Sequence, residues 1–253
     1  MAGDATATRS SVAPLWGELR FSRELARLLA DGEFLAPRRR PDAQPVLLIP
    51  GFMAGDASMV MLRSWLRRRG HRVSMSGIRA NVDCAERMLG RLQVNLRDLA
   101  GESGRPVFLI GQSRGGALAR SLAVRNPDIV SGLVMLGTPV RDPLAVSSPV
   151  LQTVRWVARL GDLGLPGVFS STCKDGECCA SFRADLNARI EPDITVIAVH
   201  SRSDGIVDWK ACLDPHAERV HVDSSHCGMS VHREVYEVLD RVLDDSREAA
   251  WSG

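Results

Sequence analysis

Ser113 lies in the pattern G-x-S-x-G, with Gly111 two residues before it and Gly115 two residues after it. An apolar run over 107–110 leads into this pattern, and small and apolar residues from Ala117 onward predict a helix after it. This context, strand, turn and helix, is typical of a serine held on a sharp turn at the carboxyl edge of a parallel strand. The flanking glycines are required because the strand and helix backbones pass close together there. The pattern therefore predicts an exposed, nucleophilic serine, with the helix dipole favouring negative charge beside it.

A serine nucleophile needs a base within hydrogen-bond reach, and the base needs an acid that orients it. His226 follows the last expected strand and precedes the last expected helix. Asp204 lies in the loop after the preceding strand, beside a glycine. The order Ser113, Asp204, His226 is the order expected for this sheet topology. We therefore predict His226 as the base and Asp204 as the acid, with Asp208 as the alternative acid.

Ester or amide chemistry also needs hydrogen-bond donors for the tetrahedral oxyanion, each contributing about 3 kcal/mol when preorganised. The backbone N–H of Arg114, the residue after the serine, is one expected donor. The second is expected from the loop after the first strand, where Gly51 allows a tight turn and Phe52 supplies its N–H. We expect the Arg114 side chain to point away and form a structural ion pair. The alternative is contact with a polar or anionic part of the substrate.

Short apolar segments alternate with helical patterns along the chain, which predicts an α/β fold: a mostly parallel central sheet with helices on both faces. The expected strands are 46–49, 71–76, 107–110, 130–136, 194–199 and 220–222. Expected helices cover 14–31, 57–69, 84–99, the segment after Gly116, 149–160 and 231–243. All the candidate site residues follow carboxyl ends of strands, so we expect them to meet at one edge of the sheet.

The predicted organisation is an N-terminal helix and connector over 1–44, followed by one α/β domain over 45–253. A cap or lid insertion is expected at about 140–192, because no strand pattern appears there. Its helix would carry an apolar stripe formed by Val150, Leu151, Val154, Val157 and Leu160. Such a segment would lie over the carboxyl edge of the sheet, where open α/β sheets bind ligands. The alternative is an ordinary excursion packed on the core.

Composition sets further bounds. The chain has 253 residues, of which 45% are hydrophobic, and this is enough for one large core. Its 32 basic and 30 acidic residues give a net charge of +2, which offers no reason to expect nucleic acid or an anionic membrane as a partner. No apolar stretch approaches the ~20 residues that span a bilayer. The N-terminus has no secretory signal pattern. We therefore expect a cytoplasmic protein, with a trimmed secreted form as the alternative.

Six cysteines are too few for a disulfide scaffold in a chain of this length. Cys173, Cys178 and Cys179 form a C-x4-C-C pattern, for which a small disulfide-closed loop or a thiolate metal site could be considered. No histidine stands nearby at ligand spacing, which disfavours the metal. A local disulfide, with Cys212 as another possible partner, or reduced buried thiols remain open. We expect no metal and no cofactor.

Taken together, these motifs resemble the α/β-hydrolase-fold serine hydrolases of the lipase and esterase type. The resemblance covers about 45–243 and rests on Pro50-Gly51-Phe52, Gly111-Gln-Ser113-Arg-Gly115, Asp204-Gly205 and Ser225-His226. It implies Ser113 as nucleophile, Asp204 as acid, His226 as base, and the N–H groups of Phe52 and Arg114 as oxyanion donors. Two features depart from the family pattern. Many relatives have His-Gly in place of Pro50-Gly51, and a helix stands where leading antiparallel strands are common.

The function that the resemblance implies is hydrolysis of carboxylic esters with hydrophobic acyl groups, through an acyl-enzyme and without a cofactor. The expected partner is a small-molecule ester or thioester. A thioesterase, an acyltransferase or a cyclase would use the same three residues with a different acyl acceptor. A non-catalytic ligand-binding protein on this fold is a third possibility, against which the intact Ser113, Asp204 and His226 argue.

Overall fold

A computed structural model of the chain describes residues 12–36 and 44–249. The polar N-terminus and most of the expected connector (37–43) lie outside the described residues. The centre of the protein is one sheet of six strands in the order β2-β1-β3-β4-β5-β6, and every neighbouring pair is parallel. The strands are β1 (Pro45–Ile49), β2 (Arg72–Met75), β3 (Val107–Gln112), β4 (Val130–Leu136), β5 (Thr195–His200) and β6 (Glu218–His221).

The central strands are apolar because both of their faces are covered. β1 and β3 are buried along their whole length, as expected for a parallel sheet between two helical layers. The edge strand β6 is exposed at most of its positions and carries charged residues, which discourages pairing with another chain. The predicted mostly parallel sheet is confirmed.

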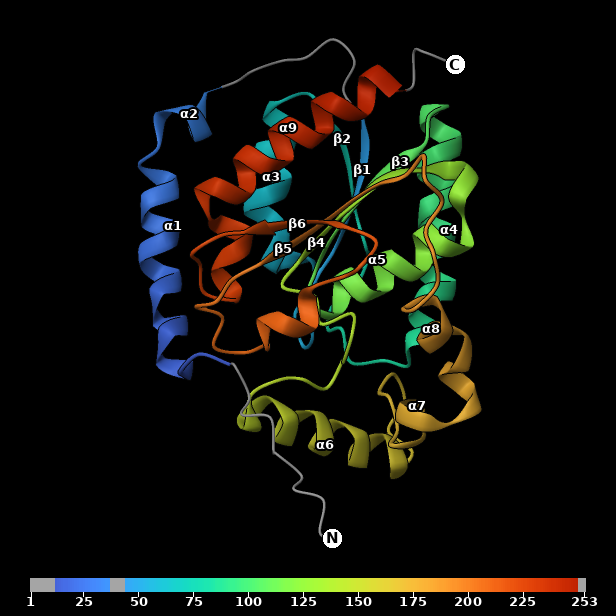
Figure 1. Cartoon of the computed structure of the whole chain (residues 1–253). Coiled ribbons are helices and arrows are strands. Elements are labelled where there is room, and N and C mark those ends of the chain that lie inside the picture. Colours follow the sequence, from blue (N-terminus) through green and yellow to red (C-terminus); the bar gives the residue numbers. More distant parts are fainter. Residues whose placement is uncertain (1–11, 37–43, 250–253) are drawn as a thin grey trace, which may run out of the picture.

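Helices cover both faces of this sheet (Figure 1). On one face lie α1 (Phe21–Leu29), α3 (Val60–Arg68) and α9 (Arg233–Ala249); on the other lie α4 (Ala85–Ser103) and α5 (Arg114–Arg125). Each layer has its own apolar core: Leu28, Leu62 and Leu239 belong to one, and Leu92 and Leu118 to the other. The fold class is therefore α/β with helices on both faces, as the sequence predicts.

The N-terminal helices pack directly on the sheet domain. They comprise the short helix η1 (Leu15–Arg20), then α1, then α2 (Gly32–Leu35). Leu28 and Phe34 are buried in the same core cluster as the strand residue Leu48. The ring of Phe34 meets the edge of Tyr236 on α9 at a centroid distance of 5.3 Å. This packing places η1 and α1 beside the loops that follow β5 and β6.

Residues between β4 and β5 form a separate excursion, which we call the insertion (137–194). It holds α6 (Ser148–Asp162), α7 (Thr172–Asp175), η4 (Glu177–Cys179) and α8 (Ala180–Asp185). α6 and α7 lie across the lower end of the molecule in Figure 1. The expected helix 149–160 is therefore present as α6. Elsewhere the chain forms the short helices η2 (Asp56–Met59), η3 (Pro127–Ile129), η5 (Trp209–Cys212) and η6 (Cys227–Val231).

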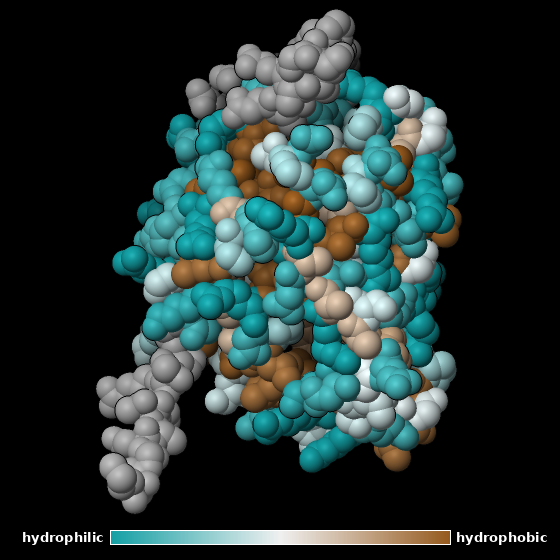
Figure 2. Space-filling view, turned by 45° about the vertical axis from the view of Figure 1, so that its right-hand side comes forward, coloured by the Kyte–Doolittle hydropathy of each residue, from teal (hydrophilic) through white to brown (hydrophobic). Residues whose placement is uncertain are grey.

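The part of the insertion from α6 to η4 buries little apolar surface, whereas Val140, Leu186 and Ile190 near its two ends belong to the core. α6 contains no buried residue, and in the described stretch 161–180 the single buried residue is Cys179. Of the expected stripe, Val150, Leu151, Val154 and Val157 are half-buried, while Leu160 is 44% exposed. Apolar surface is visible at this end of the molecule in Figure 2. In the insertion, Trp156 is 63% exposed and Leu163 is 84% exposed. Within the described part of the chain, each helix is too short or too polar to cross a bilayer.

Candidate active site

Ser113 lies on a strained turn between β3 and α5. Its φ of 51° is in the left-handed region, which costs a residue with a side chain about 1–3 kcal/mol. A Cβ on Gly111 would lie 2.5 Å from the Gly116 backbone, and one on Gly115 would lie 2.3 Å from the Ile49 carbonyl oxygen. These approaches are too close for any side chain, so the glycine spacing has the steric cause that the sequence predicts. The Ser113 N–H donates to the Leu136 carbonyl at 2.7 Å, which holds the strained conformation.

His226 and Asp204 form a buried pair. Nδ1 of His226 lies 2.6 Å from Oδ2 of Asp204, and the two residues are 5% and 2% exposed. The other carboxylate oxygen, Oδ1, accepts hydrogen bonds from the N–H groups of Ile206 (2.8 Å) and Val207 (2.7 Å). These backbone donors fix the carboxylate in one orientation. With Nδ1 donating to Asp204, Nε2 is the ring nitrogen left to accept a proton.

The charge state of His226 depends on its acidic neighbours. Burial lowers the pKa of this histidine, but the Asp204 carboxylate, with a smaller contribution from Glu18, raises the pKa above its ordinary value. The site therefore stabilises the imidazolium form, the form that results when a histidine takes a proton from a serine.

The three predicted residues stand at the same edge of the sheet. Ser113 follows β3, Asp204 follows β5, and His226 follows β6. The His226 ring packs against Gly137, directly after β4, where a Cβ would meet the ring at 3.0 Å. In addition, the Gln112 side chain donates to the His226 carbonyl oxygen at 3.1 Å. The residue before the serine is thus hydrogen-bonded to the loop after β6, which carries His226 (the histidine loop, 223–228).

Asp208, the alternative acid, has a different position. Its carboxylate caps the short helix η5 and accepts a hydrogen bond from the Lys210 N–H at 2.9 Å. This is the ordinary role of an aspartate at a helix N-terminus. The geometry therefore favours Asp204 over Asp208 as the partner of His226.

The loop after β1 lies beside the serine. A Cβ on Gly51 would be 3.3 Å from the Ser113 Cβ, so Gly51 permits this approach. Asn81 holds the loop in place, because its side chain donates to the Pro50 carbonyl at 2.8 Å and its backbone forms a β-bridge with Phe52. The Arg114 N–H lies at the first position of α5, where helices leave N–H groups without intrahelical partners. Gly51 and Arg114 therefore adjoin the serine, and the N–H groups of Phe52 and Arg114 stay the predicted oxyanion donors.

The Arg114 side chain does not form the expected ion pair. It donates instead to the backbone carbonyl oxygens of Asn81 (2.9 Å) and Asp83. Its guanidinium carbon lies 5.1 Å from the ring centroid of Phe169, which also contacts Phe52 at a centroid distance of 6.1 Å. Burial lowers the pKa of Arg114 to about 10, so the group stays charged at neutral pH. The sequence did not predict these contacts because the two carbonyl groups belong to the irregular segment between β2 and α4, and backbone groups leave no residue-type pattern.

Comparison with known protein families identifies the family of this chain. The sequence model of the family described as Hydrolase_4, serine aminopeptidase S33, matches residues 66–242. The chain belongs to this family. A search of curated protein sequences found no match.

Solved structures similar to this S33 chain include several lipases. The mature lipase BlEst2 of Bacillus licheniformis superposes with a TM-score of 0.60 at 17% identity, over 81% of this chain and 94% of the other. A soluble variant of the monoglyceride lipase of Saccharomyces cerevisiae gives 0.57 at 14% identity, over 84% and 89%. The monoacylglycerol lipase of Paleococcus ferrophilus gives 0.54 at 14%, over 81% and 94%. At these identities the likeness establishes the α/β-hydrolase fold.

The sequence did not identify two carboxylates that hold the loops of the site in the S33 chain. Glu18 on η1 accepts hydrogen bonds from three backbone N–H groups, those of Gly205 (3.1 Å), His226 (2.9 Å) and Cys227 (3.0 Å). Glu24 on α1 accepts from the Ser225 N–H (3.0 Å) and the Ser225 hydroxyl (2.6 Å). The two side chains therefore tie the loop after β5 and the loop after β6 to the N-terminal helices.

No local pattern could have revealed these contacts. Glu18 and Glu24 look like ordinary surface acids of an amphipathic helix, and their partners are backbone groups about 200 positions away in the sequence. A useful signal would have been Gly228, where a Cβ would lie 1.8 Å from the Glu24 carboxylate. That glycine is required because the loop backbone approaches the buried acid closely.

Proposed function

We propose that this protein is a serine hydrolase that cleaves carboxylic esters through an acyl-enzyme intermediate. The observation that carries the proposal is the buried 2.6 Å contact between His226 Nδ1 and Asp204 Oδ2, at the sheet edge where Ser113 occupies a strained turn. A ligand-binding protein has no need for an oriented acid and histidine at the same sheet edge as a serine on a strained turn. The membership of a hydrolase family is in agreement with this function.

In the proposed reaction, the Ser113 hydroxyl attacks the ester carbonyl carbon while His226 Nε2 accepts its proton. The oxyanion accepts hydrogen bonds from the N–H groups of Phe52 and Arg114. His226 then donates its proton to the leaving alcohol, and the acyl group remains on the serine. A water molecule, deprotonated by His226, attacks the acyl-enzyme and releases the carboxylic acid. Asp204 stays ionised throughout and stabilises the imidazolium.

The insertion suggests the substrate class. α6 presents half-buried valines and a leucine, and Phe169 lies against Phe52 beside the serine. We propose that the insertion acts as a lid and that its apolar groups favour esters with hydrophobic acyl chains. The lipases among the similar structures share the fold on which this proposal rests.

The test is a series of p-nitrophenyl esters, from acetate to long acyl chains, with the wild type and Ser113→Ala in parallel. We expect the wild type to release p-nitrophenol and Ser113→Ala to lose at least about 10⁴-fold in kcat, because the nucleophile is absent. A fluorophosphonate probe should label the wild type alone. Circular dichroism should show that Ser113→Ala retains the fold.

Two other outcomes would change the proposal. Absence of both turnover and probe labelling would contradict it and favour a ligand-binding protein. Labelling without ester turnover would favour the thioesterase, acyltransferase or cyclase alternatives, since these retain the activated serine. Addition of an alcohol or amine acceptor separates them, because a transferase then forms the new ester or amide in place of the free acid.

A further inference from the structure

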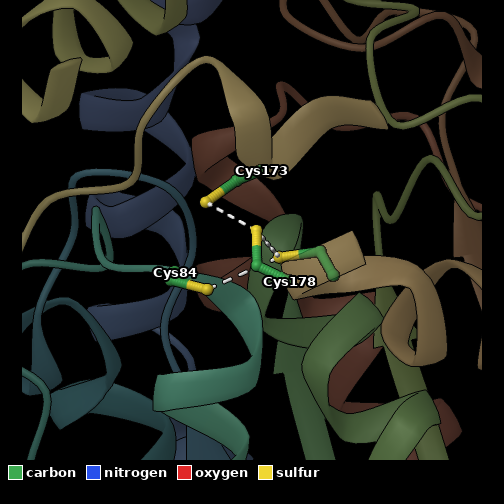
Figure 3. Close-up of side chains that lie close together, drawn as sticks. Cys84, Cys173 and Cys178 are labelled. Atoms are coloured by element: carbon green, nitrogen blue, oxygen red, sulfur yellow. Dashed lines mark hydrogen bonds between the residues drawn. The ribbon is translucent and has the colours of Figure 1, made fainter. Parts of the chain in front are cut away.

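Four cysteine side chains converge where the insertion meets the start of α4. Cys84 precedes α4, Cys173 lies in α7, and the neighbouring pair Cys178 and Cys179 lies in η4. The four sulfur atoms all lie within 4.8 Å of one another. Figure 3 shows the side chains of Cys84, Cys173 and Cys178 pointing toward a common centre. This cluster is separate from the residues of the proposed reaction.

The sulfur separations match those of a tetrahedral thiolate site. The sulfurs of Cys84 and Cys179 are 3.5 Å apart, those of Cys173 and Cys178 are 3.7 Å apart, and those of Cys178 and Cys179 are 3.9 Å apart. Four thiolates bound to zinc at about 2.3 Å occupy corners that are about 3.8 Å apart. Two independent disulfides would bring the sulfurs together in pairs and would not require all four around one point.

The middle of the insertion, residues 161–180, has almost no apolar core of its own. Between 161 and 180, Cys179 is the single buried residue, and α7 and η4 are four and three residues long. Helices this short are not stable on their own in water. Small segments without an apolar core are commonly held by a structural metal, whose binding free energy then contributes to folding.

Positive charge lies beside the cluster. The Arg114 guanidinium donates to the carbonyl oxygen of Asp83, the residue before Cys84. Arg87 on α4 donates to the carbonyl oxygen of Val168 at 3.0 Å and forms an ion pair with the Asp83 carboxylate. A zinc ion with four thiolates carries two net negative charges. The Arg114 guanidinium can compensate part of that charge, whereas Arg87 is already paired with Asp83.

We propose that Cys84, Cys173, Cys178 and Cys179 bind one Zn²⁺ ion, which fastens the insertion to α4 beside the reaction site. On binding, each thiol gives up its proton to solvent and each sulfur forms one bond to the metal. The sequence disfavoured a metal because no histidine stands near the C-x4-C-C pattern. The missing ligand is instead Cys84, which lies 95 positions from Cys179 in the sequence.

Zinc at this site would also restrain Phe169, the insertion residue that lies beside Phe52. Phe169, four residues before Cys173, donates its N–H to the Val82 carbonyl at 2.7 Å, two residues before Cys84. The same phenyl ring contacts Phe52 and Arg114. Zinc binding would therefore fix the position of Phe169 without touching the reacting groups.

The test begins with the metal content of the full chain, expressed in zinc-supplemented medium and purified without chelator. We expect one zinc per chain by mass spectrometry of the metal. Cys178→Ser, which alters an exposed ligand, should retain less than about a tenth of that amount. Cys227→Ser is the matched control, because Cys227 is also exposed but lies outside the cluster, and it should retain the full amount. Cobalt added to the metal-free protein should give the visible absorption of a tetrahedral cobalt thiolate in the wild type and in Cys227→Ser, and not in Cys178→Ser.

A second measurement tests the fastening role. Removal of zinc by a chelator should increase protease cleavage within 163–176 at least tenfold, while cleavage elsewhere stays unchanged. Unchanged cleavage after complete zinc removal would overturn this role. A reduced protein that binds neither zinc nor cobalt would overturn the site, as would two disulfides that persist under reducing conditions. None of these measurements depends on ester hydrolysis, so they stand or fall independently of the proposed function.

Discussion

Two regions lie at the carboxyl edge of the sheet, and they are held by different means. The histidine loop (223–228) is anchored by Glu18 and Glu24, which accept hydrogen bonds from its backbone. The insertion packs on the core near its two ends, where Val140 and Leu186 are buried, but it buries a single residue between 161 and 180. In that middle stretch, Phe169 and the cysteine cluster contact other elements. The comparison teaches that the proposed proton-transfer groups are fixed by the fold itself, whereas the middle of the insertion, which would contact the substrate, is attached by contacts that can be altered separately.

Among substitutions of the residues that support His226, Asp204→Asn should reduce kcat the most. The amide cannot stabilise the imidazolium, so we expect kcat to fall about 10⁴-fold. The Asp204 carboxylate raises the pKa of His226, and a base acts in its neutral form. Residual activity should therefore rise with pH through a lower apparent pKa than in the wild type. Stopped-flow or long-time assays of ester cleavage across pH measure both effects.

The control for that variant is Asp208→Asn. Asparagine caps helices about as well as aspartate, so η5 should be preserved and turnover should stay within about twofold of the wild type. The reverse pattern, with Asp208→Asn inactive and Asp204→Asn active, would show that Asp208 is the acid.

Glu18→Gln should have an intermediate effect. One carboxylate serves three backbone donors, and the amide would place an N–H₂ group against at least one of them. Loss of a charge-assisted bond costs about 1.5–3 kcal/mol. We expect a lower thermal midpoint, a kcat reduced about tenfold, and an acid limb of the pH profile moved to lower pH because Glu18 raises the pKa of His226.

Glu237→Gln is the matched control for Glu18→Gln. Its side chain is 60% exposed and pairs with Arg233 on the same helix, so the substitution should change neither kcat nor the pH profile. A Glu18→Gln variant that is destabilised but keeps the wild-type pH profile would assign Glu18 a purely structural role.

Phe169→Ala should have the smallest effect on chemistry and a selective effect on substrates. Removal of the ring opens the space beside Phe52 and Arg114. We expect kcat/KM for long acyl esters to fall about tenfold, equivalent to ~1.4 kcal/mol, while acetate ester turnover stays within about twofold. Leu163→Ala, at a position 84% exposed in the same insertion, should leave both unchanged. Equal losses on short and long esters would argue against Phe169 as part of an acyl pocket.

The sheet could be predicted from the sequence because its signals are local. The strands β1, β3 and β4 are runs of apolar residues bounded by glycine or proline, and each was found within two residues of its expected start and end. The serine turn was predicted for the same reason, since its glycine spacing reflects contacts among neighbouring residues. The proximity of Asp204 and His226 followed from topology, because parallel strands bring their carboxyl ends to one edge.

What could not be predicted depends on contacts between distant segments. Glu18 binds backbone groups, which carry no residue-type signal, and the Arg114 guanidinium likewise binds carbonyl oxygens. The cysteine cluster was seen only in part, because Cys84 comes from another element than the C-x4-C-C pattern. Sequence reveals a site when its groups share one turn or follow the carboxyl ends of parallel strands, and does not reveal partners that are backbone groups or cysteines from separate elements.

The bond between Glu18 and the His226 backbone has a consequence for biosynthesis. The two residues are 208 positions apart, so the helix that supports the histidine loop is synthesised long before its partner. A ribosome-bound chain that ends before β6 holds the acids of the N-terminal helices without the backbone donors that they bind. Contacts of such long sequence separation require closure of a long loop, which is costly in entropy. The proposed activity should therefore appear only after the histidine loop has left the ribosome.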